Sequence, residues 1–82
     1  MKILYSKKFL KHFKRCSEKI LKQFQSRMSL LNKNPSLPIL RNHPLIGCLN
    51  GYFAFSVTGD YRVVYRIMDQ NSIKLNDIGS RS

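Results

Sequence analysis

The sequence contains few acidic residues, because four Asp and Glu stand against fifteen Lys and Arg and the formal net charge is +11. It has no tryptophan and only two cysteines, Cys16 and Cys48. The two cysteines form no Cys-x-x-Cys pair and have no histidine at zinc spacing, so we expect reduced thiols, no metal site and no other cofactor. No apolar run approaches the ~20 residues that cross a bilayer, and the N-terminus lacks the features of a signal peptide. We therefore expect a cytoplasmic protein that does not bind membranes.

A chain of 82 residues is long enough for one small domain, which we expect to span residues 1–82 with a modest core. Its charge is uneven. Residues 1–41 hold eight Lys, three Arg and one Glu (+10), and residues 42–82 hold one Lys, three Arg and three Asp (+1). So basic a half attracts nucleic acid, an acidic protein or an anionic surface. The simpler alternative is that these basic residues only form a solvent-exposed helical face and bind no partner.

The first half of the chain reads as a strand followed by two helices. The short apolar segment 3–5 predicts a strand, and Ser6 predicts the N-cap of a helix over residues 7–16. Ser17 predicts a second N-cap, and two prolines end that second helix near Asn34. The apolar residues of the second helix recur with a period of 3.6: Ile20, Leu21, Phe24, Met28 and Leu31.

The second half reads as a loop over residues 39–51 and then three strands, 52–58, 61–68 and 72–80. Gly59-Asp60 is typical of a two-residue hairpin turn, with positive φ at Gly59. We therefore predict an α+β fold. In it, the N-terminal strand and the helical hairpin pack on one face of a mainly antiparallel four-stranded sheet. The stripe Ile20, Phe24, Met28 and Leu31 should be buried against Ala54, Val63 and Tyr65.

A two-residue turn would place Val57 opposite Arg62 and Phe53 opposite Arg66. Because side chains alternate along a strand, one face would then carry Phe53, Phe55, Val57, Arg62, Val64 and Arg66. Aromatic rings that stack on bases beside guanidinium groups that bind phosphate form a typical RNA-binding surface. The alternative is two surface arginines lying over exposed apolar residues.

The order of several short motifs then resembles one family. The segments are His43-Pro44-Leu45-Ile46-Gly47, Gly51-Tyr52, the strand from Asp60 to Arg66, and Ile78-Gly79-Ser80-Arg81. Together they resemble the RelE/ParE superfamily of bacterial type II toxins, on its RelE/YafQ-like side. The resemblance implies a fold related to small microbial ribonucleases and a cytoplasmic toxin that cuts mRNA on the ribosome and blocks translation. It also implies a cognate antitoxin whose acidic or amphipathic segment wraps the toxin.

Metal-free RNA cleavage must activate a 2′-hydroxyl, stabilise a phosphorane dianion and protonate the leaving oxygen. Arg62 and Arg81 are candidates for the second task, because guanidinium binds phosphate bidentately and stays charged. His43 is the candidate for proton transfer, with Asp60 orienting it or acting as a base. The alternatives are a loop histidine bonded to the backbone and an ordinary turn aspartate. His12, on the basic helix, reads as a surface residue.

Five basic residues of the helices would bind ribosomal RNA, or equally an acidic antitoxin segment: Lys8, Lys11, Arg15, Lys19 and Lys22. Many relatives have histidine where this chain has Arg81, and they usually continue with an aromatic residue beyond the position of Ser82. We therefore expect a metal-independent endoribonuclease with reduced activity. The alternatives are a ParE-like inhibitor of DNA gyrase and an inactive module that binds the antitoxin.

Overall fold

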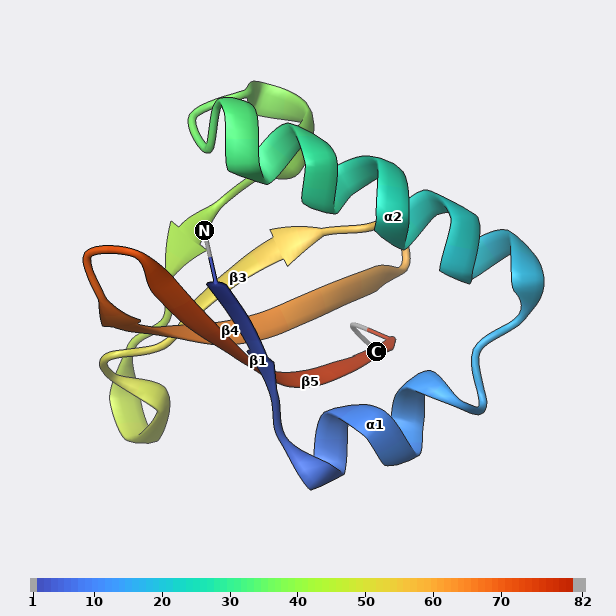
Figure 1. Ribbon diagram of the computed structural model, residues 1–82, viewed down its shortest axis with the longest axis horizontal. Coiled ribbons are helices and arrows are strands. Elements are labelled where there is room, and N and C mark those ends of the chain that lie inside the picture. The colour runs from blue at the N-terminus through green and yellow to red at the C-terminus, as the bar shows by residue number, and fades with distance from the viewer. Residues whose placement is uncertain (1, 81–82) are drawn as a thin grey trace.

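The computed structural model describes residues 2–80 and has the predicted α+β architecture (Figure 1). The elements in chain order are β1 (Lys2–Tyr5), α1 (Lys7–Phe13), α2 (Glu18–Lys33), the 3-10 turn η1 (Pro38–Leu40), β2 (His43–Pro44), the 3-10 turn η2 (Gly47–Leu49), β3 (Phe53–Ser56), β4 (Tyr61–Asp69) and β5 (Ser72–Ser80). The strands lie in the order β1-β5-β4-β3-β2. β1 runs parallel to β5, and the other neighbours are antiparallel. The sheet has five strands instead of the predicted four, because His43–Pro44 pairs with β3 where we expected a loop.

Both helices begin at the predicted caps. The Ser6 hydroxyl accepts a hydrogen bond from the Phe9 N–H at 2.9 Å, and the Ser17 hydroxyl accepts one from the Ile20 N–H at 3.4 Å. These bonds satisfy backbone donors that have no partner within the helix. α1 is shorter than predicted and ends at Phe13, although Cys16 beyond it still packs against the core.

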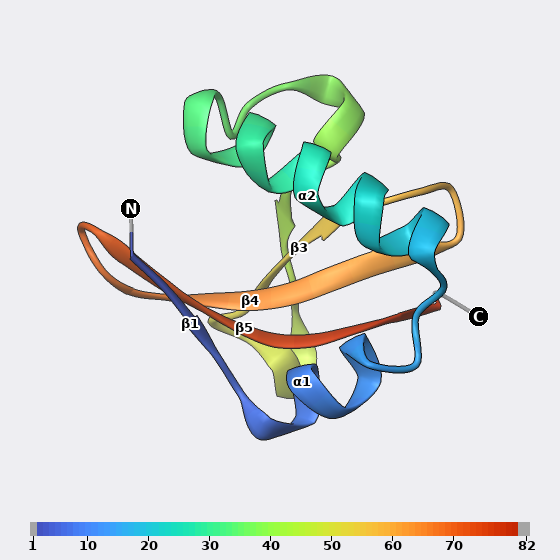
Figure 2. The ribbon, with the colours of Figure 1, turned by 45° about the vertical axis from the view of Figure 1, so that its right-hand side comes forward.

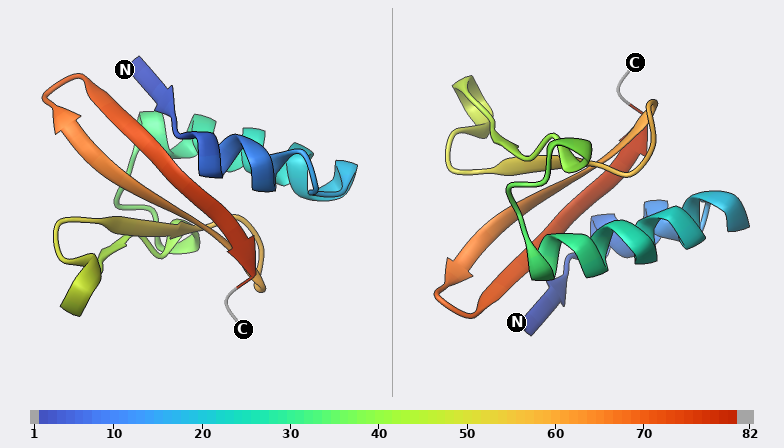
Figure 3. Two further views of the ribbon diagram at one scale, coloured as in Figure 1. Left: turned by 90° about the horizontal axis from the view of Figure 1, so that it is seen from below. Right: turned by 90° about the horizontal axis from the view of Figure 1, so that it is seen from above.

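The core lies between the helices and one face of the sheet. Figure 3 shows α1 and α2 along the same side of the sheet. The Phe24 ring of α2 lies 5.8 Å from the Phe9 ring and 5.2 Å from the Phe13 ring of α1. Phe24 and Leu31 are buried as predicted, while Ile20 and Met28 are half-buried against the same cluster.

The β3–β4 hairpin differs from the prediction by one residue of register. Ser56 pairs with Arg62, and Phe55 pairs with Val63. The connecting loop has four residues, 57–60, instead of two. The Thr58 hydroxyl accepts hydrogen bonds from the N–H groups of Asp60 and Tyr61, and Gly59 does not adopt positive φ. This side-chain turn replaces the predicted tight turn.

Because the side-chain period of a strand is two, a shift of one residue moves every β3 side chain to the other face. Phe53 and Phe55 therefore lie on the helix side, where Phe55 is 1% exposed. The prediction that these two rings stack on RNA beside the arginines was wrong. Ala54 alternates with them and faces away from the helices, so its predicted packing against α2 was also wrong. Val63 and Tyr65 of β4 lie in the core as predicted.

Within the described residues, β5 beyond Leu75 has a strand, β4, on one side only, and α1 covers its other edge (Figure 2). The Ser6 N–H donates to the Leu75 carbonyl at 3.0 Å, and the Ser6 hydroxyl donates to the Asn76 carbonyl at 2.7 Å. Covering an edge in this way satisfies backbone groups and blocks pairing with another chain. It also places the residues of α1 next to the face of the sheet that the helices leave uncovered.

Candidate active site

The sheet face that points away from the core is called the open face here. Paired residues share a face, so the pairs His43–Ala54, Ala54–Val64 and Val64–Asp77 form one row across it. The row Ser56–Arg62–Gly79 lies next to it, two residues along each strand. A third row contains Arg66, Lys74 and Leu4. The open face therefore has a floor of small side chains with basic groups around it.

Arg62 lies beside a small hollow in this face. The hollow has a volume of about 80 Å³ and is lined by Arg62, Val64, Asp77, Gly79 and Ser80. Arg62 is half-buried, whereas Arg66 is exposed. The Arg66 guanidinium lies 5.8 Å from the centre of the Tyr52 ring. A phosphate group in the hollow would meet the planar fork of Arg62.

His43 lies in the edge strand β2 and is exposed. Its Nδ1 is 2.6 Å from the carbonyl oxygen of Arg41. A carbonyl oxygen can only accept, so Nδ1 carries the proton and Nε2 keeps a lone pair. The backbone bond that was the alternative reading of His43 is therefore present, and it leaves the second ring nitrogen available for proton transfer.

Asp60, another predicted catalytic residue, does not line the hollow beside Arg62. Asp60 is exposed in the β3–β4 loop, where its N–H donates to the Thr58 hydroxyl at 3.2 Å. This is the position of a turn residue, and a catalytic role for Asp60 stays a prediction. Arg81 lies outside the described residues.

The five basic residues predicted to bind RNA are all exposed on α1, on α2 or between them: Lys8, Lys11, Arg15, Lys19 and Lys22. Two of them have acidic neighbours. The Lys8 ammonium lies 3.6 Å from the Asp77 carboxylate, and that of Lys22 lies 4.0 Å from Glu18. Ion pairs this exposed contribute little to stability, so all five charges are available to a polyanion.

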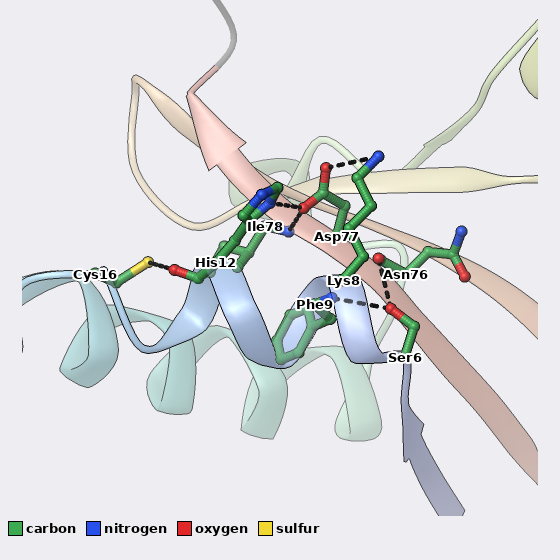
Figure 4. A network of polar contacts seen from close by, with 8 residues as sticks. All are labelled: Ser6, Lys8, Phe9, His12, Cys16, Asn76, Asp77 and Ile78. Carbon is green, nitrogen blue, oxygen red and sulfur yellow. Dashed lines mark hydrogen bonds and ion pairs between the residues drawn. The ribbon is translucent and has the colours of Figure 1, made fainter.

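His12 is a candidate functional residue that the sequence did not indicate, since we expected it at the surface. His12 is half-buried, and its Nδ1 lies 2.5 Å from Oδ1 of Asp77 (Figure 4). The same oxygen accepts a hydrogen bond from the Ile78 N–H at 2.9 Å. The two residues are 65 positions apart, and no local pattern in the sequence indicates their contact.

Burial affects two further titratable groups. It raises the pKa of the Cys16 thiol, which donates a weak hydrogen bond to the His12 carbonyl at 3.5 Å. A thiol with a raised pKa stays protonated at neutral pH and is a poor nucleophile. Burial also raises the pKa of Tyr65, whose hydroxyl donates a hydrogen bond to the Asn42 side-chain oxygen at 2.8 Å.

Within residues 2–80, no group of three or more His, Cys, Asp or Glu side chains is arranged to hold a metal ion. No helix in the same part of the chain is long and apolar enough to cross a membrane.

The comparison with known proteins agrees with this fold. A family model described as "Bacterial toxin of type II toxin-antitoxin system, YafQ" matches residues 1–82. Because the match spans the whole chain, the chain belongs to the YafQ family of type II toxin–antitoxin toxins. This confirms the resemblance to RelE/YafQ-like toxins inferred from the sequence motifs. No curated protein sequence matches the chain significantly.

Several solved structures share the fold. YafQ from E. coli strain BL21(DE3) is 24% identical with a TM-score of 0.81, over 96% of this chain and 91% of that chain. A YoeB/ParE toxin from Agrobacterium tumefaciens is 16% identical with a TM-score of 0.80, over 100% of each chain. A chain of the E. coli DinJ–YafQ complex is 25% identical with a TM-score of 0.74, over 95% of this chain and 90% of that chain.

Proposed function

We propose that this toxin is a metal-independent endoribonuclease that cuts mRNA on the ribosome and thereby blocks translation. The observation that supports the proposal is the position of Arg62. It is half-buried beside a hollow in the open face, with basic side chains in the rows around it. A guanidinium group in such a place suits a phosphate that gains negative charge during reaction.

The residues of the open face can be given roles in this reaction. Arg62 would stabilise the pentacoordinate phosphate, and His43 would transfer a proton through Nε2, since its Nδ1 is bonded to a backbone carbonyl. Arg66 and Lys74 share this face and would contact phosphates on either side of the scissile one. The hollow is too small to orient an RNA strand by itself. The ribosome would therefore hold the RNA in position and offset much of the entropy cost of aligning the reacting groups.

Primer extension on cellular mRNA tests this function. The full-length reading frame is expressed briefly, and cleavage sites are mapped on a translated mRNA and on the same mRNA without a start codon. We expect cuts within codons of the translated message only. Growth inhibition without any cuts would contradict the nuclease proposal, and DNA breaks trapped on gyrase would then indicate the ParE-like alternative.

We further infer that an antitoxin with an acidic segment binds this chain. The E. coli DinJ–YafQ toxin–antitoxin complex contains a chain of the same fold that is 25% identical to this one. The net charge of +11 favours an acidic partner, because complementary charge steers association and excludes wrong partners. Such a segment would compete with RNA for the same basic residues.

The basic helices should provide affinity without sequence specificity. Changing Lys11, Arg15 and Lys22 to Glu should weaken ribosome binding strongly and flatten its salt dependence. Each phosphate contact removed lowers the slope of log affinity against log salt by about 0.7 to 0.9. The measurement is the binding constant for ribosomes at several salt concentrations. The same three residues changed to Gln provide the control, which should flatten the slope while weakening binding less. An unchanged slope in both variants would contradict the prediction.

Gly79 offers a way to block the hollow without removing a functional group. It pairs with Arg62, and a Cβ at Gly79 would meet no atom within 4 Å. A valine there should therefore be tolerated by the fold and should even stabilise the strand by about 0.5–1 kcal/mol or more. Its side chain would project beside Arg62, so we expect Gly79→Val to lower mRNA cleavage at least about tenfold while raising the melting temperature.

The measurements are calorimetry and primer extension on the same preparation. Gly59→Val is the control, because Gly59 also has open space around it but lies in the exposed β3–β4 loop. Wild-type cleavage by Gly79→Val would show that RNA does not enter this hollow.

A further inference from the structure

The reaction proposed above needs two proton transfers, on opposite sides of the phosphate. The attacking 2′-oxygen loses a proton and the leaving 5′-oxygen gains one. His43 lies on β2, on one side of Arg62, and can serve one of these oxygens. The second oxygen needs a proton-transfer group on the other side of Arg62, near β5. The following inference about that group rests on the proposed nuclease function.

His12 lies on that side of Arg62. The row His43–Ala54–Val64–Asp77 crosses three strand spacings, or about 14 Å at about 4.8 Å each, and His12 contacts Asp77 at its end. The Asp77 side chain lines the same hollow as Arg62. Arg62 therefore lies between the two histidines, with His43 at one border of the open face and His12 at the other.

The contacts of His12 fix its tautomer. A carboxylate only accepts hydrogen bonds, so the short contact with Asp77 means that Nδ1 of His12 carries a proton and that Nε2 of the neutral ring has a lone pair. Asp77 is held in turn by the Ile78 N–H and approached by Lys8 (Figure 4). A carboxylate bonded to Nδ1 orients an imidazole and stabilises the positive charge that it acquires on accepting a proton.

The ring also lines an open space. The His12 side chain is 35% exposed and borders a second hollow of about 200 Å³. The second hollow is lined by His12, Arg15, Cys16, Tyr61, Ile78, Gly79 and Ser80. Gly79 and Ser80 border both hollows. Tyr61 and the buried Ile78 belong to the helix side of the sheet, so the second hollow continues from the open face around the end of β5. A nucleotide next to the scissile phosphate would occupy this second hollow, which Arg15 and Tyr61 also line.

We propose that His12, held by Asp77, is the general base of RNA cleavage and that the hollow beside it binds the nucleotide that carries the attacking 2′-hydroxyl. Nε2 of His12 takes the proton of the 2′-hydroxyl while the O2′–P bond forms. The P–O5′ bond breaks, and the 5′-oxygen receives a proton from the protonated His43. The products are a 2′,3′-cyclic phosphate and a 5′-hydroxyl end, with no change of oxidation state.

A purely structural role for the pair is the competing explanation, because the pair also joins α1 to β5. However, α1 is already held on β5 by the two hydrogen bonds of Ser6. His12→Asn separates the two roles. The asparagine amide can still donate to Asp77 from the position of Nδ1, but it cannot take up a proton. Lys14→Ala is the control, since Lys14 is an exposed basic residue at the end of the same helix and lines neither hollow.

The experiment measures single-turnover cleavage of mRNA bound in saturating, programmed ribosomes. We expect His12→Asn to cut about a hundredfold more slowly with a melting temperature near that of the wild type, and Lys14→Ala to cut at the wild-type rate. The same assay uses mRNA with a bridging 5′-sulfur, a leaving group that needs no proton. The loss in His12→Asn should persist with sulfur, whereas a loss in His43→Gln should disappear.

The dependence of the rate on pH gives a second readout. In the plot of cleavage rate against pH, the region where the rate rises with pH should be absent for His12→Asn. The other titratable or charged groups that contact His12 or line its hollow are Asp77, Arg15, Cys16 and Tyr61, and Lys8 and Arg62 lie next to Asp77. Retention of that rise with pH, or rescue of His12→Asn by the 5′-sulfur substrate, would overturn the assignment of His12 as the base.

Should His12→Asn fail to fold, NMR of the wild-type protein with nitrogen-15 histidine decides the question. The nitrogen shifts must show His12 protonated at Nδ1 when neutral and titrating at Nε2. The opposite tautomer would overturn the proposal. A wild-type protein that cuts no mRNA on ribosomes would refute the proposed function and this role together. Wild-type cleavage with an equally active His12→Asn would refute only the role of His12.

Discussion

Arg62→Ala should lower ribosome-dependent cleavage of mRNA by roughly a hundred- to a thousandfold and abolish growth inhibition. Losing one preorganised group that stabilises a developing oxyanion costs about 2.7–4 kcal/mol of transition-state stabilisation. Arg62 fits that role because it lines the hollow in the open face and is half-buried there. Its side chain points away from the helices, so the fold and the binding of an antitoxin to the helical surface should be retained. Single-turnover cleavage on programmed ribosomes measures the loss, and circular dichroism checks the fold.

Arg66→Ala is the matched control for this experiment. Arg66 has the same charge on the same strand and the same face, but it is exposed and lies over the Tyr52 ring. We expect less than a tenfold effect from its removal. Arg62→Lys should recover only part of the activity, because an ammonium keeps the charge but not the bidentate fork. Full toxicity and full cleavage by Arg62→Ala would remove the nuclease interpretation of the open face.

The parts of the fold that were predicted correctly depend on local chemistry. Both helix starts follow from a serine whose hydroxyl caps the first turn, and both caps are present. The end of α2 follows from the proline-containing segment after Asn34. The bounds of β5 also match the prediction. In each case the information lies within a few neighbouring residues.

The β3–β4 hairpin shows where such local reasoning fails and where it still holds. The choice between two and four loop residues depends on the Thr58 hydroxyl, which bonds two backbone N–H groups. That choice decides the face of every β3 residue, including Phe53 and Phe55. It does not affect β4, because Arg62 and Val63 lie on opposite faces of one continuous strand whatever its partner. Arg62 was therefore placed correctly although its predicted partner was wrong.

The contact between His12 and Asp77 could not be predicted from the sequence for a different reason. It depends on β1 pairing in parallel with the first half of β5, so that α1, which follows β1, lies along the second half of the same strand. A parallel pairing between the two ends of the chain leaves no periodic signal in either segment. The partner of His12 follows from topology, and only the structure provides the topology.

Phe24→Ala should have the largest effect on stability of the changes considered, with a loss of about 3–5 kcal/mol in the free energy of unfolding. Phe24 is 6% exposed and its ring contacts the rings of Phe9 and Phe13. Alanine would leave a cavity between the two helices, which are connected there mainly by these rings. In a domain of this size, such a loss should lower the melting temperature by about 12 °C or more.

Urea denaturation measures the effect, with a lower midpoint and an unchanged slope expected. Phe24→Leu is the control and should cost much less, because it fills most of the same volume. A loss below about 1 kcal/mol in Phe24→Ala would show that the helices do not share this core.

The variant also tests how function depends on packing. α1 carries both Phe9 and His12, so loosening its contact with α2 should weaken the His12–Asp77 contact before the sheet itself unfolds. If α1 positions the proton acceptor, cleavage by Phe24→Ala should fall at temperatures where β4 and β5 are still paired.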